Sequence, residues 1–187
     1  MHADKPLGKI IEMYDVPRER AVLPTPGWEG WAGGGKARRF WLHPRLLVGG
    51  AILNADDGLH LRRDFGITHV ASFESERLDH GKGWPHARLC WTPFVDVGET
   101  IHPALLRQAL DFAVDTLSLD DSVLYAHCQL GGGRGPSLGY MICTGPLRQP
   151  PALVLERIRG VPGCNPHLAY LSSIDAVVLE RYGAHAA

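Results

Sequence analysis

The sequence predicts an α/β domain in which a central, mostly parallel sheet of four to five strands is flanked by helices. Short apolar, β-branched segments alternate along the chain with amphipathic helical segments, which is typical of buried parallel strands joined by helices. The length of 187 residues fits one domain that buries a core without disulfides or metal. The hydrophobic content of 45% agrees with a globular chain.

The first elements are predicted from residue 46 onward. Residues 46–50 are apolar and end in two glycines, so we expect a short strand there. Asn54 is a helix cap, and Asp57 in the following first turn suits the helix dipole. Gly66 ends this helix, and the β-branched residues 67–73 form the next buried strand.

The second half of the chain continues the alternation. Residues 89–95 are predicted to form a strand. Residues 103–118 are the clearest predicted helix, because their apolar side chains recur at helical spacing. Residues 123–126 form a short central strand that enters a glycine-rich loop. Further helices are expected near 136–143, near 151–159 and from Asn165-Pro166 onward.

Residues 1–41 differ from the rest of the chain, and we expect them to be an N-terminal extension that packs on a domain spanning residues 42–187. Four prolines before residue 27 disfavour helices, yet the large rings between residues 28 and 41 are too many for a solvated tail. The basic cluster Lys36, Arg38 and Arg39 is expected to be a solvated patch.

Charge and cysteine content restrict the classes of function. A net charge of −1 argues against a nucleic-acid partner, which would favour a basic excess. No apolar run is long enough to span a membrane, and the first residues lack a signal-peptide pattern. The four cysteines lie far apart without paired spacing, which favours reduced thiols and a cytoplasmic protein.

The chemistry is expected in residues 127–137, His-Cys-Gln-Leu-Gly-Gly-Gly-Arg-Gly-Pro-Ser. A strand delivers Cys128 to a glycine-rich turn, and a helix starts directly after it. Glycines permit unusual backbone angles, so that successive N–H groups can face one anion, and the helix N-terminus adds positive charge. Arg134 can bind two phosphate oxygens. We therefore predict a phosphate-binding loop at Cys128, Gln129, Leu130, Gly131, Gly132, Gly133 and Arg134.

The same positive field is expected to lower the pKa of Cys128 to roughly 3.5–7.5, so that its thiolate is a nucleophile at neutral pH. Other phosphate-loop patterns do not fit. No lysine stands where a Walker loop needs one, and the dinucleotide pattern Gly-x-Gly-x-x-Gly does not occur in this segment.

His-Cys, five residues and then Arg resembles the signature loop of the protein tyrosine phosphatases. Residues 42–180 resemble the dual-specificity branch of that superfamily, in segments 43–49, 65–70 and 162–171. This resemblance implies the Cys-x5-Arg phosphatase fold. It implies a phosphatase without metal or other cofactor, which hydrolyses phosphoprotein substrates or small phosphomonoesters through a cysteinyl-phosphate intermediate.

The resemblance also implies a general acid on a loop about thirty residues before the cysteine. Asp96 occupies that place after a predicted strand, with Glu99 as the second choice. His127 is expected to hold the loop and tune the thiolate through hydrogen bonds. The superfamily usually has Ser or Thr after the loop arginine, but Gly135 stands here and the next hydroxyl is Ser137. We therefore predict slow hydrolysis of the phosphoenzyme.

Two alternatives remain open, and several properties stay undetermined. A non-catalytic phosphate-binding pseudophosphatase would keep the loop, and a rhodanese-like sulfurtransferase also uses a cysteine loop. A metal hydrolase is disfavoured because the ten histidines are scattered without ligand spacing. Whether phosphotyrosine or phosphoserine and phosphothreonine are preferred is open, as is the oligomeric state. No nucleic-acid or membrane partner is expected.

Overall fold

In this computed structural model, which describes residues 28–29, 39–75, 84 and 88–184, the chain folds around a six-stranded sheet with the order β1-β2-β3-β6-β4-β5. Strands β3, β6, β4 and β5 pair in parallel, while β1 and β2 extend one edge in antiparallel pairing. The strands are β1 (Trp28–Glu29), β2 (Arg39–His43), β3 (Leu46–Gly49), β4 (His69–Ser72), β5 (Leu89–Trp91) and β6 (Leu124–His127).

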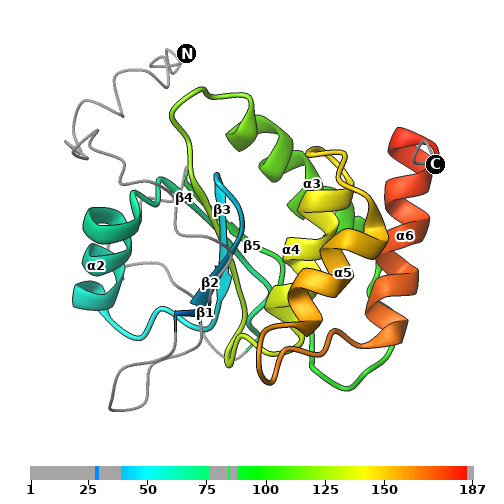
Figure 1. The fold of residues 1–187 in the computed structure, drawn as a ribbon, viewed down its shortest axis with the longest axis horizontal. Coiled ribbons are helices and arrows are strands. Elements are labelled where there is room, and N and C mark those ends of the chain that lie inside the picture. Colours follow the sequence, from blue (N-terminus) through cyan, green and yellow to red (C-terminus); the bar gives the residue numbers. More distant parts are fainter. Residues whose placement is uncertain (1–27, 30–38, 76–83, 85–87, 185–187) are drawn as a thin grey trace, which may run out of the picture.

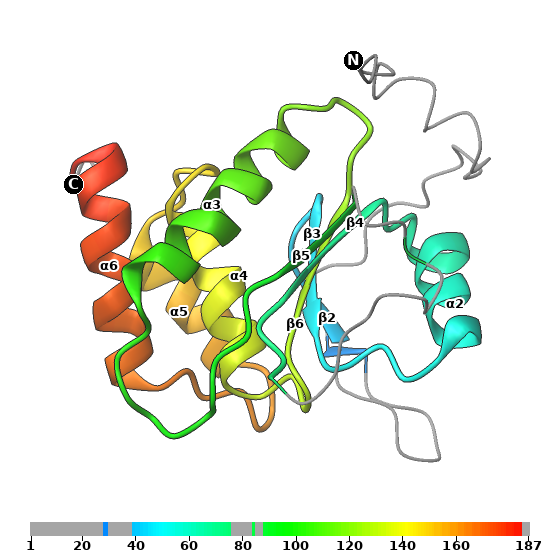
Figure 2. The same cartoon turned by 180° about the vertical axis from the view of Figure 1, so that it is seen from behind.

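Helices cover both faces of the sheet. Helix α2 packs on one face, and α3, α4, α5 and α6 pack together on the other (Figures 1 and 2). The helices are α2 (Ala55–Phe65), α3 (Pro103–Leu117), α4 (Arg134–Thr144), α5 (Pro151–Arg159) and α6 (Leu168–Tyr182).

Local sequence signals explain where several of these helices begin and end. The Asn54 side chain accepts a hydrogen bond from the backbone N–H of Asp57 at 2.9 Å and so caps α2. Gly66 ends α2 in the left-handed region at φ 66°, where a side chain would be strained. Pro103 stands in the first turn of α3, where its missing N–H leaves no helical hydrogen bond unmade.

The sheet separates two hydrophobic cores. The larger one packs α3–α6 against the sheet, and the smaller one packs α2 against the opposite face. Apolar side chains of strands β2 to β6 alternate between the two cores, as the two-residue period of a strand requires. In β6, for example, Leu124 and Ala126 belong to the larger core and Tyr125 to the smaller one.

The predicted α/β class, with its mostly parallel central sheet flanked by helices, is confirmed. The antiparallel strands β1 and β2 at one edge of the sheet were not predicted. Because of β2, the residues near position 40 are part of the sheet. The expected boundary between residues 41 and 42 falls inside β2, because Phe40, Trp41 and Leu42 are buried in the sheet. Most of the expected extension, residues 1–27 and 30–38, lies outside the described residues.

Two further expectations differ from the structure. Arg39 is buried against Asp57 rather than solvated; Lys36 and Arg38 lie outside the described residues. Helix α6 begins at Leu168, three residues after the predicted cap, and the Asn165 N–H donates to Gly132 O at 2.8 Å. The segment before α6 is thus bound to the loop after β6 instead of starting a helix.

The carboxyl ends of the parallel strands all lie at the same end of the sheet, where ligands bind in such folds. The loops that follow β5, β6 and α5 all lie at that end of the molecule (Figures 1 and 2). Within the described residues, no helix has the length and apolar character needed to cross a membrane.

Candidate active site

Strand β6 is a central strand of the sheet, and it places Cys128 at the end of the sheet where the parallel strands have their carboxyl ends. It pairs with β3 on one side and β4 on the other, and all of its residues are buried. Cys128 follows directly and is itself buried. Its backbone N–H donates to Gly49 O at 3.3 Å, and Ala51 N donates to Gln129 O at 3.0 Å. The segment after β3 therefore fixes the start of the Cys128–Arg134 loop, called the cysteine loop below.

The cysteine loop turns its N–H groups inward. The N–H groups of Leu130, Gly131 and Gly135 form hydrogen bonds to the sulfur of Cys128. Gly131 has a φ of 75°, which favours glycine and allows this inward turn. N–H groups that converge on one point at a helix start are typical of anion-binding sites, so this geometry is compatible with the predicted phosphate-binding loop, which stays a prediction.

The titration of Cys128 differs from the expectation of a low pKa. Burial raises the pKa of the thiol, while the N–H groups of Gly135, Gly131 and Leu130 and the charge of Arg134 lower it. Burial outweighs the donors, so that the pKa lies above its ordinary value. The sequence showed the donors of the loop but could not show that the sulfur they surround is shielded from water.

Arg134 is the first residue of α4, and its guanidinium is held from several sides. Its Nη1 donates to Phe73 O at 3.2 Å, to Ser75 Oγ at 3.1 Å and to Phe94 O at 3.0 Å. Its Nε lies 3.4 Å from Oδ2 of Asp96. These acceptors keep the buried guanidinium oriented beside the cysteine loop, and the charge of Arg134 acts on Cys128.

Asp96 lies on the loop after β5, and Tyr170 of α6 orients its carboxylate. The Tyr170 hydroxyl donates to Oδ1 of Asp96 at 2.7 Å and accepts from Gly98 N at 2.9 Å. Burial and the hydrogen bond to Asp96 raise the pKa of Tyr170, so the hydroxyl keeps its proton. With Oδ1 engaged, Oδ2 is the oxygen that faces Arg134.

Close packing between this loop and α6 explains the glycine at position 98. Gly98 has a φ of 73°, and a Cβ there would lie 2.6 Å from the His167 ring. Phe94 packs edge-on against Phe73 at 5.0 Å and against Tyr170 at 5.2 Å between ring centroids. The loop that carries Asp96 therefore packs against the residue that follows β4 and against α6.

The residue after Arg134 is glycine for a steric reason. A Cβ at Gly135 would lie 2.8 Å from Gly49 O and 3.1 Å from Cys128 N, too close without a backbone shift. The nearby hydroxyl of Ser137 donates at 2.9 Å to the carbonyl oxygen of Gly133, the residue that precedes α4. The Ser137 hydroxyl proton is therefore bonded to the Gly133 carbonyl, and the Gly135 N–H is the group that donates to the sulfur of Cys128.

His127 holds the start of the loop from the other face of the sheet. Its Nδ1 lies 3.2 Å from Cys128 O, and its ring stacks on Tyr125 at 5.2 Å. The Tyr125 hydroxyl donates to Gly50 O, and Arg39 Nε lies 3.4 Å from the same hydroxyl. These contacts connect the histidine to the segment that binds Cys128 N.

The structure thus brings together Cys128, Arg134 and Asp96, which the sequence singled out. Glu99, the second acid considered, is exposed and has no hydrogen bond within the described part of the chain. Sequence reasoning missed Tyr170, whose position in the last helix indicated only packing. The available signal for Tyr170 in the sequence was its position near the start of the helix predicted after Asn165-Pro166, where a hydroxyl can reach a neighbouring loop.

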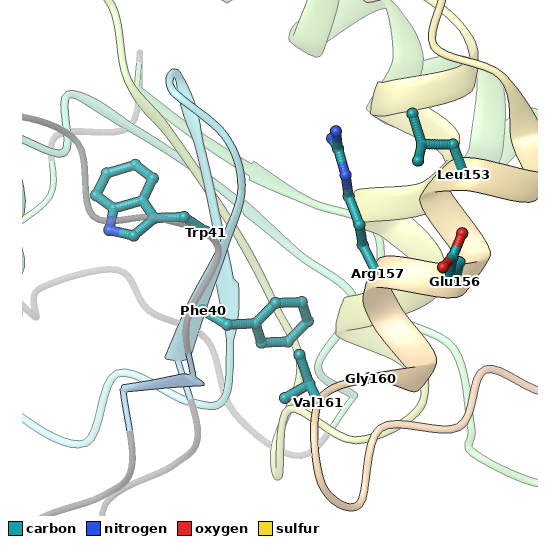
Figure 3. A pocket seen from close by; sticks show the side chains of 7 residues that line it. All are labelled: Phe40, Trp41, Leu153, Glu156, Arg157, Gly160 and Val161. Atoms are coloured by element: carbon teal, nitrogen blue, oxygen red, sulfur yellow. The ribbon is translucent and has the colours of Figure 1, made fainter.

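No group of His, Cys, Asp or Glu among the described residues could hold a metal ion. A separate pocket of about 400 Å³ lies between β2 and α5 (Figure 3). Neither Cys128 nor Arg134 lines this pocket, so it is not part of the site described here. Its lining residues are Phe40, Trp41, Leu153, Glu156, Arg157, Gly160 and Val161.

No protein-family model matches the sequence, and no curated protein matches it. Solved structures do match. PTPMT1 in complex with PI(5)P superposes with a TM-score of 0.63 at 15% identity, over 74% of this chain and 93% of that one. Human DUSP28 gives 0.62 at 15% identity, over 76% and 93%.

A third similar structure is the human tyrosine phosphatase-like serine/threonine/tyrosine-interacting protein, with a TM-score of 0.58 at 13% identity, over 74% of this chain and 93% of that one. These proteins share the parallel sheet flanked by helices. The chain therefore has the fold of the protein tyrosine phosphatase superfamily, in the form found in the dual-specificity phosphatases.

Proposed function

We propose that this protein is a metal-independent, cysteine-dependent phosphatase that hydrolyses phosphomonoesters through a cysteinyl-phosphate intermediate. The observation that carries the proposal is the convergence of three loop N–H groups and the charge of Arg134 on the sulfur of Cys128. The carboxylate of Asp96 lies beside the Arg134 guanidinium, with Oδ2 3.4 Å from Nε. This arrangement joins an anion site, a nucleophile and an acid.

In the first step the Cys128 thiolate attacks phosphorus. The S–P bond forms, the bond from phosphorus to the leaving oxygen breaks, and protonated Asp96 gives its proton to that oxygen. Arg134 and the loop N–H groups stabilise the charge on the phosphoryl oxygens. Tyr170 orients the acid by holding Oδ1, which leaves Oδ2 for proton transfer.

In the second step a water oxygen attacks phosphorus, the S–P bond breaks and Asp96 accepts the proton of the water. The Cys128 thiolate is the leaving group, and the Gly135 N–H stabilises it. A neutral N–H is the donor at this position because a side chain at residue 135 would contact Gly49 O. We expect this step to be slow.

Slow hydrolysis has a kinetic signature. After rapid mixing with p-nitrophenyl phosphate, the first turnover should release nitrophenol in a burst of about one equivalent per site, followed by a slower steady state. A linear release from the first milliseconds, at saturating substrate, would show that the second step is not rate-limiting.

The proposal itself is tested by hydrolysis of p-nitrophenyl phosphate in the presence of a chelator. The wild-type protein should be active, and Cys128→Ser should be inactive because the serine hydroxyl is not ionised at neutral pH. Activity that needs added metal, or that survives in Cys128→Ser, would contradict a cysteine-dependent mechanism. Turnover of thiosulfate but not of the phosphate ester would indicate a sulfurtransferase.

A catalytically weak phosphate-binding protein is the second candidate, and two observations favour it. Burial raises the pKa of Cys128, which reduces the thiolate fraction at neutral pH. No side-chain hydroxyl follows Arg134, since residue 135 is glycine. In that case isothermal calorimetry would detect phosphate binding that Arg134→Met abolishes, while the wild-type protein would turn over no ester.

The substrates are proposed to be phosphorylated proteins or small phosphomonoesters. The similar PTPMT1 structure contains PI(5)P, so a phospholipid headgroup belongs among the compounds to test. The cysteine loop has no lysine between Cys128 and Arg134, which disfavours a head group with several phosphates.

A further inference from the structure

The most exposed large apolar side chains lie on segments that meet at the proposed active site. In the described part of the chain, Leu130 is 75% exposed, Leu168 72%, Val95 66% and Val97 61%, and these are the four highest values among large hydrophobic residues. Leu130 lies in the cysteine loop, the valines flank Asp96, and Leu168 begins α6. We call these four residues the apolar collar.

Contacts between the three segments that carry the collar hold these segments together beside the cysteine loop. Asp96, which lies between the two valines, faces Arg134 at 3.4 Å and accepts from Tyr170 at 2.7 Å. Tyr170 is two residues after Leu168 on α6. The same segment reaches the cysteine loop through the bond from Asn165 N to Gly132 O. The three segments therefore meet at the cysteine loop, which we propose binds phosphate.

Apolar side chains at these positions have no evident role in the folded chain itself. A buried leucine or valine gains about 1.5–3 kcal/mol from its removal from water, but side chains this exposed gain little. Single exposed leucines are ordinary, whereas several gathered around a binding loop are typical of a surface that contacts a ligand.

The charges of the three segments that carry the collar limit the kinds of ligand that these segments can bind. Residues 91–100, 129–133 and 162–170 contain neither lysine nor arginine. Their charged side chains are the exposed carboxylates Asp96 and Glu99. An acidic peptide or an anionic bilayer is recognised by basic residues, which these segments lack. An uncharged apolar group would match them.

We propose that the site prefers phosphomonoesters whose leaving group is apolar, with the phosphate in the cysteine loop and the leaving group against the apolar collar. This inference rests on the proposed function and specifies its substrate class. The collar would act by removing apolar surface of the substrate from water, and so would raise kcat/KM without changing the chemical steps.

A series of para-alkylphenyl phosphates tests this preference, because the alkyl chain lengthens while the acidity of the phenol stays nearly constant. Each methylene that is fully buried raises affinity about fourfold. We therefore expect kcat/KM to rise at least about tenfold from phenyl phosphate to 4-butylphenyl phosphate. A flat series, with phenyl phosphate still hydrolysed, would overturn the inference while leaving the proposed function intact.

Variants of the collar identify the surface responsible. Leu168→Ser and Val97→Thr should each flatten the dependence of kcat/KM on the length of the alkyl chain, because each removes apolar surface from the collar. Leu179→Ser is the matched control, since Leu179 is 57% exposed on the same helix near its other end. An equal loss of the dependence in Leu179→Ser would contradict a role for the collar.

Binding to Cys128→Ser separates this inference from the proposed function. Calorimetry with the same esters should show Kd falling as the alkyl chain lengthens, even if the wild-type protein proves to be a binding module. An unchanged Kd along the series would overturn the inference. Co-sedimentation with phosphatidylserine vesicles that Leu168→Ser abolishes would also overturn it, because the collar would then bind a membrane surface.

Discussion

Two Arg–Asp pairs in this molecule have the same chemistry but different surroundings. Arg39 Nη2 contacts both carboxylate oxygens of Asp57, at 2.7 and 2.8 Å, and both side chains are buried. The same carboxylate accepts a hydrogen bond from Leu53 N at 3.1 Å. This pair joins β2 to the start of α2.

The second pair joins Arg134 and Asp96 at the proposed active site. The guanidinium is buried at 2% exposure, but the carboxylate side chain is 45% exposed and lies 3.4 Å away. Water competes for an exposed carboxylate and weakens the pair, whereas a buried pair that loses one partner leaves an uncompensated charge. Burial of the carboxylate thus distinguishes a structural pair from one that can separate to act on a substrate.

The largest expected difference comes from the two aspartates. Asp96→Asn should lower turnover by about 10²–10⁴-fold, because the acid is lost, and leave stability and phosphate binding nearly unchanged. Asp57→Asn should instead lower the free energy of unfolding by about 3–5 kcal/mol. Steady-state kinetics and urea denaturation of both variants measure the contrast. Full activity in Asp96→Asn would show that another group is the acid.

The two arginines should differ in the same way. Arg134→Met should reduce kcat/KM by about 10²–10³-fold or more, since the transition state loses a charged donor. Arg39→Met should unfold at lower urea concentration, while the fraction that remains folded keeps its kcat/KM. A similar loss of kcat/KM in both variants at equal stability would remove the distinction between the pairs.

Tyr170→Phe should have a smaller effect that is confined to the active-site pair. The hydroxyl orients Asp96, so its removal should lower kcat/KM for phenyl phosphate about tenfold, as expected for one hydrogen bond to a charged group. The loss should be smaller for p-nitrophenyl phosphate, whose leaving group needs less help from an acid. Equal losses for both substrates would indicate a general structural role for Tyr170.

The ionisation of Cys128 gives the smallest of these effects. Burial raises the thiol pKa, so alkylation by iodoacetamide should increase with pH through a range above the ordinary thiol value of about 8.5. Because Arg134 lowers this pKa, Arg134→Met should move the alkylation profile to still higher pH. Arg39→Met is the control and should move it less. A profile centred well below the ordinary value would contradict the dominance of burial.

The sequence predicted the parts of the site that depend on neighbouring residues. Cys128, the glycines and Arg134 follow one another in a strand, loop and helix, so their local pattern was sufficient. Asp96 was predicted from the resemblance to a known loop spacing. Contacts between distant segments were not predictable: Tyr170 is 74 residues from Asp96 in the chain.

The same limit explains one expectation that the structure corrected and one sequence feature that only the structure accounts for. Arg39 lies in a basic cluster in the sequence, and only the packing of β2 beside α2 shows that Asp57 neutralises it. The glycine at 135 suggested a missing hydroxyl, but the position of Gly49 O shows why a side chain does not fit there. Each depends on which surfaces the fold brings into contact.

Covalent phosphorylation of Cys128 is the most direct test of the proposed mechanism. The wild-type protein is mixed with excess p-nitrophenyl phosphate, quenched with acid during the burst, digested and examined by mass spectrometry. The peptide that contains Cys128 should carry one phosphoryl group, which Cys128→Ser and Arg134→Met should lack. Turnover without any phosphoryl group on Cys128, under conditions where the burst is observed, would contradict the cysteinyl-phosphate mechanism.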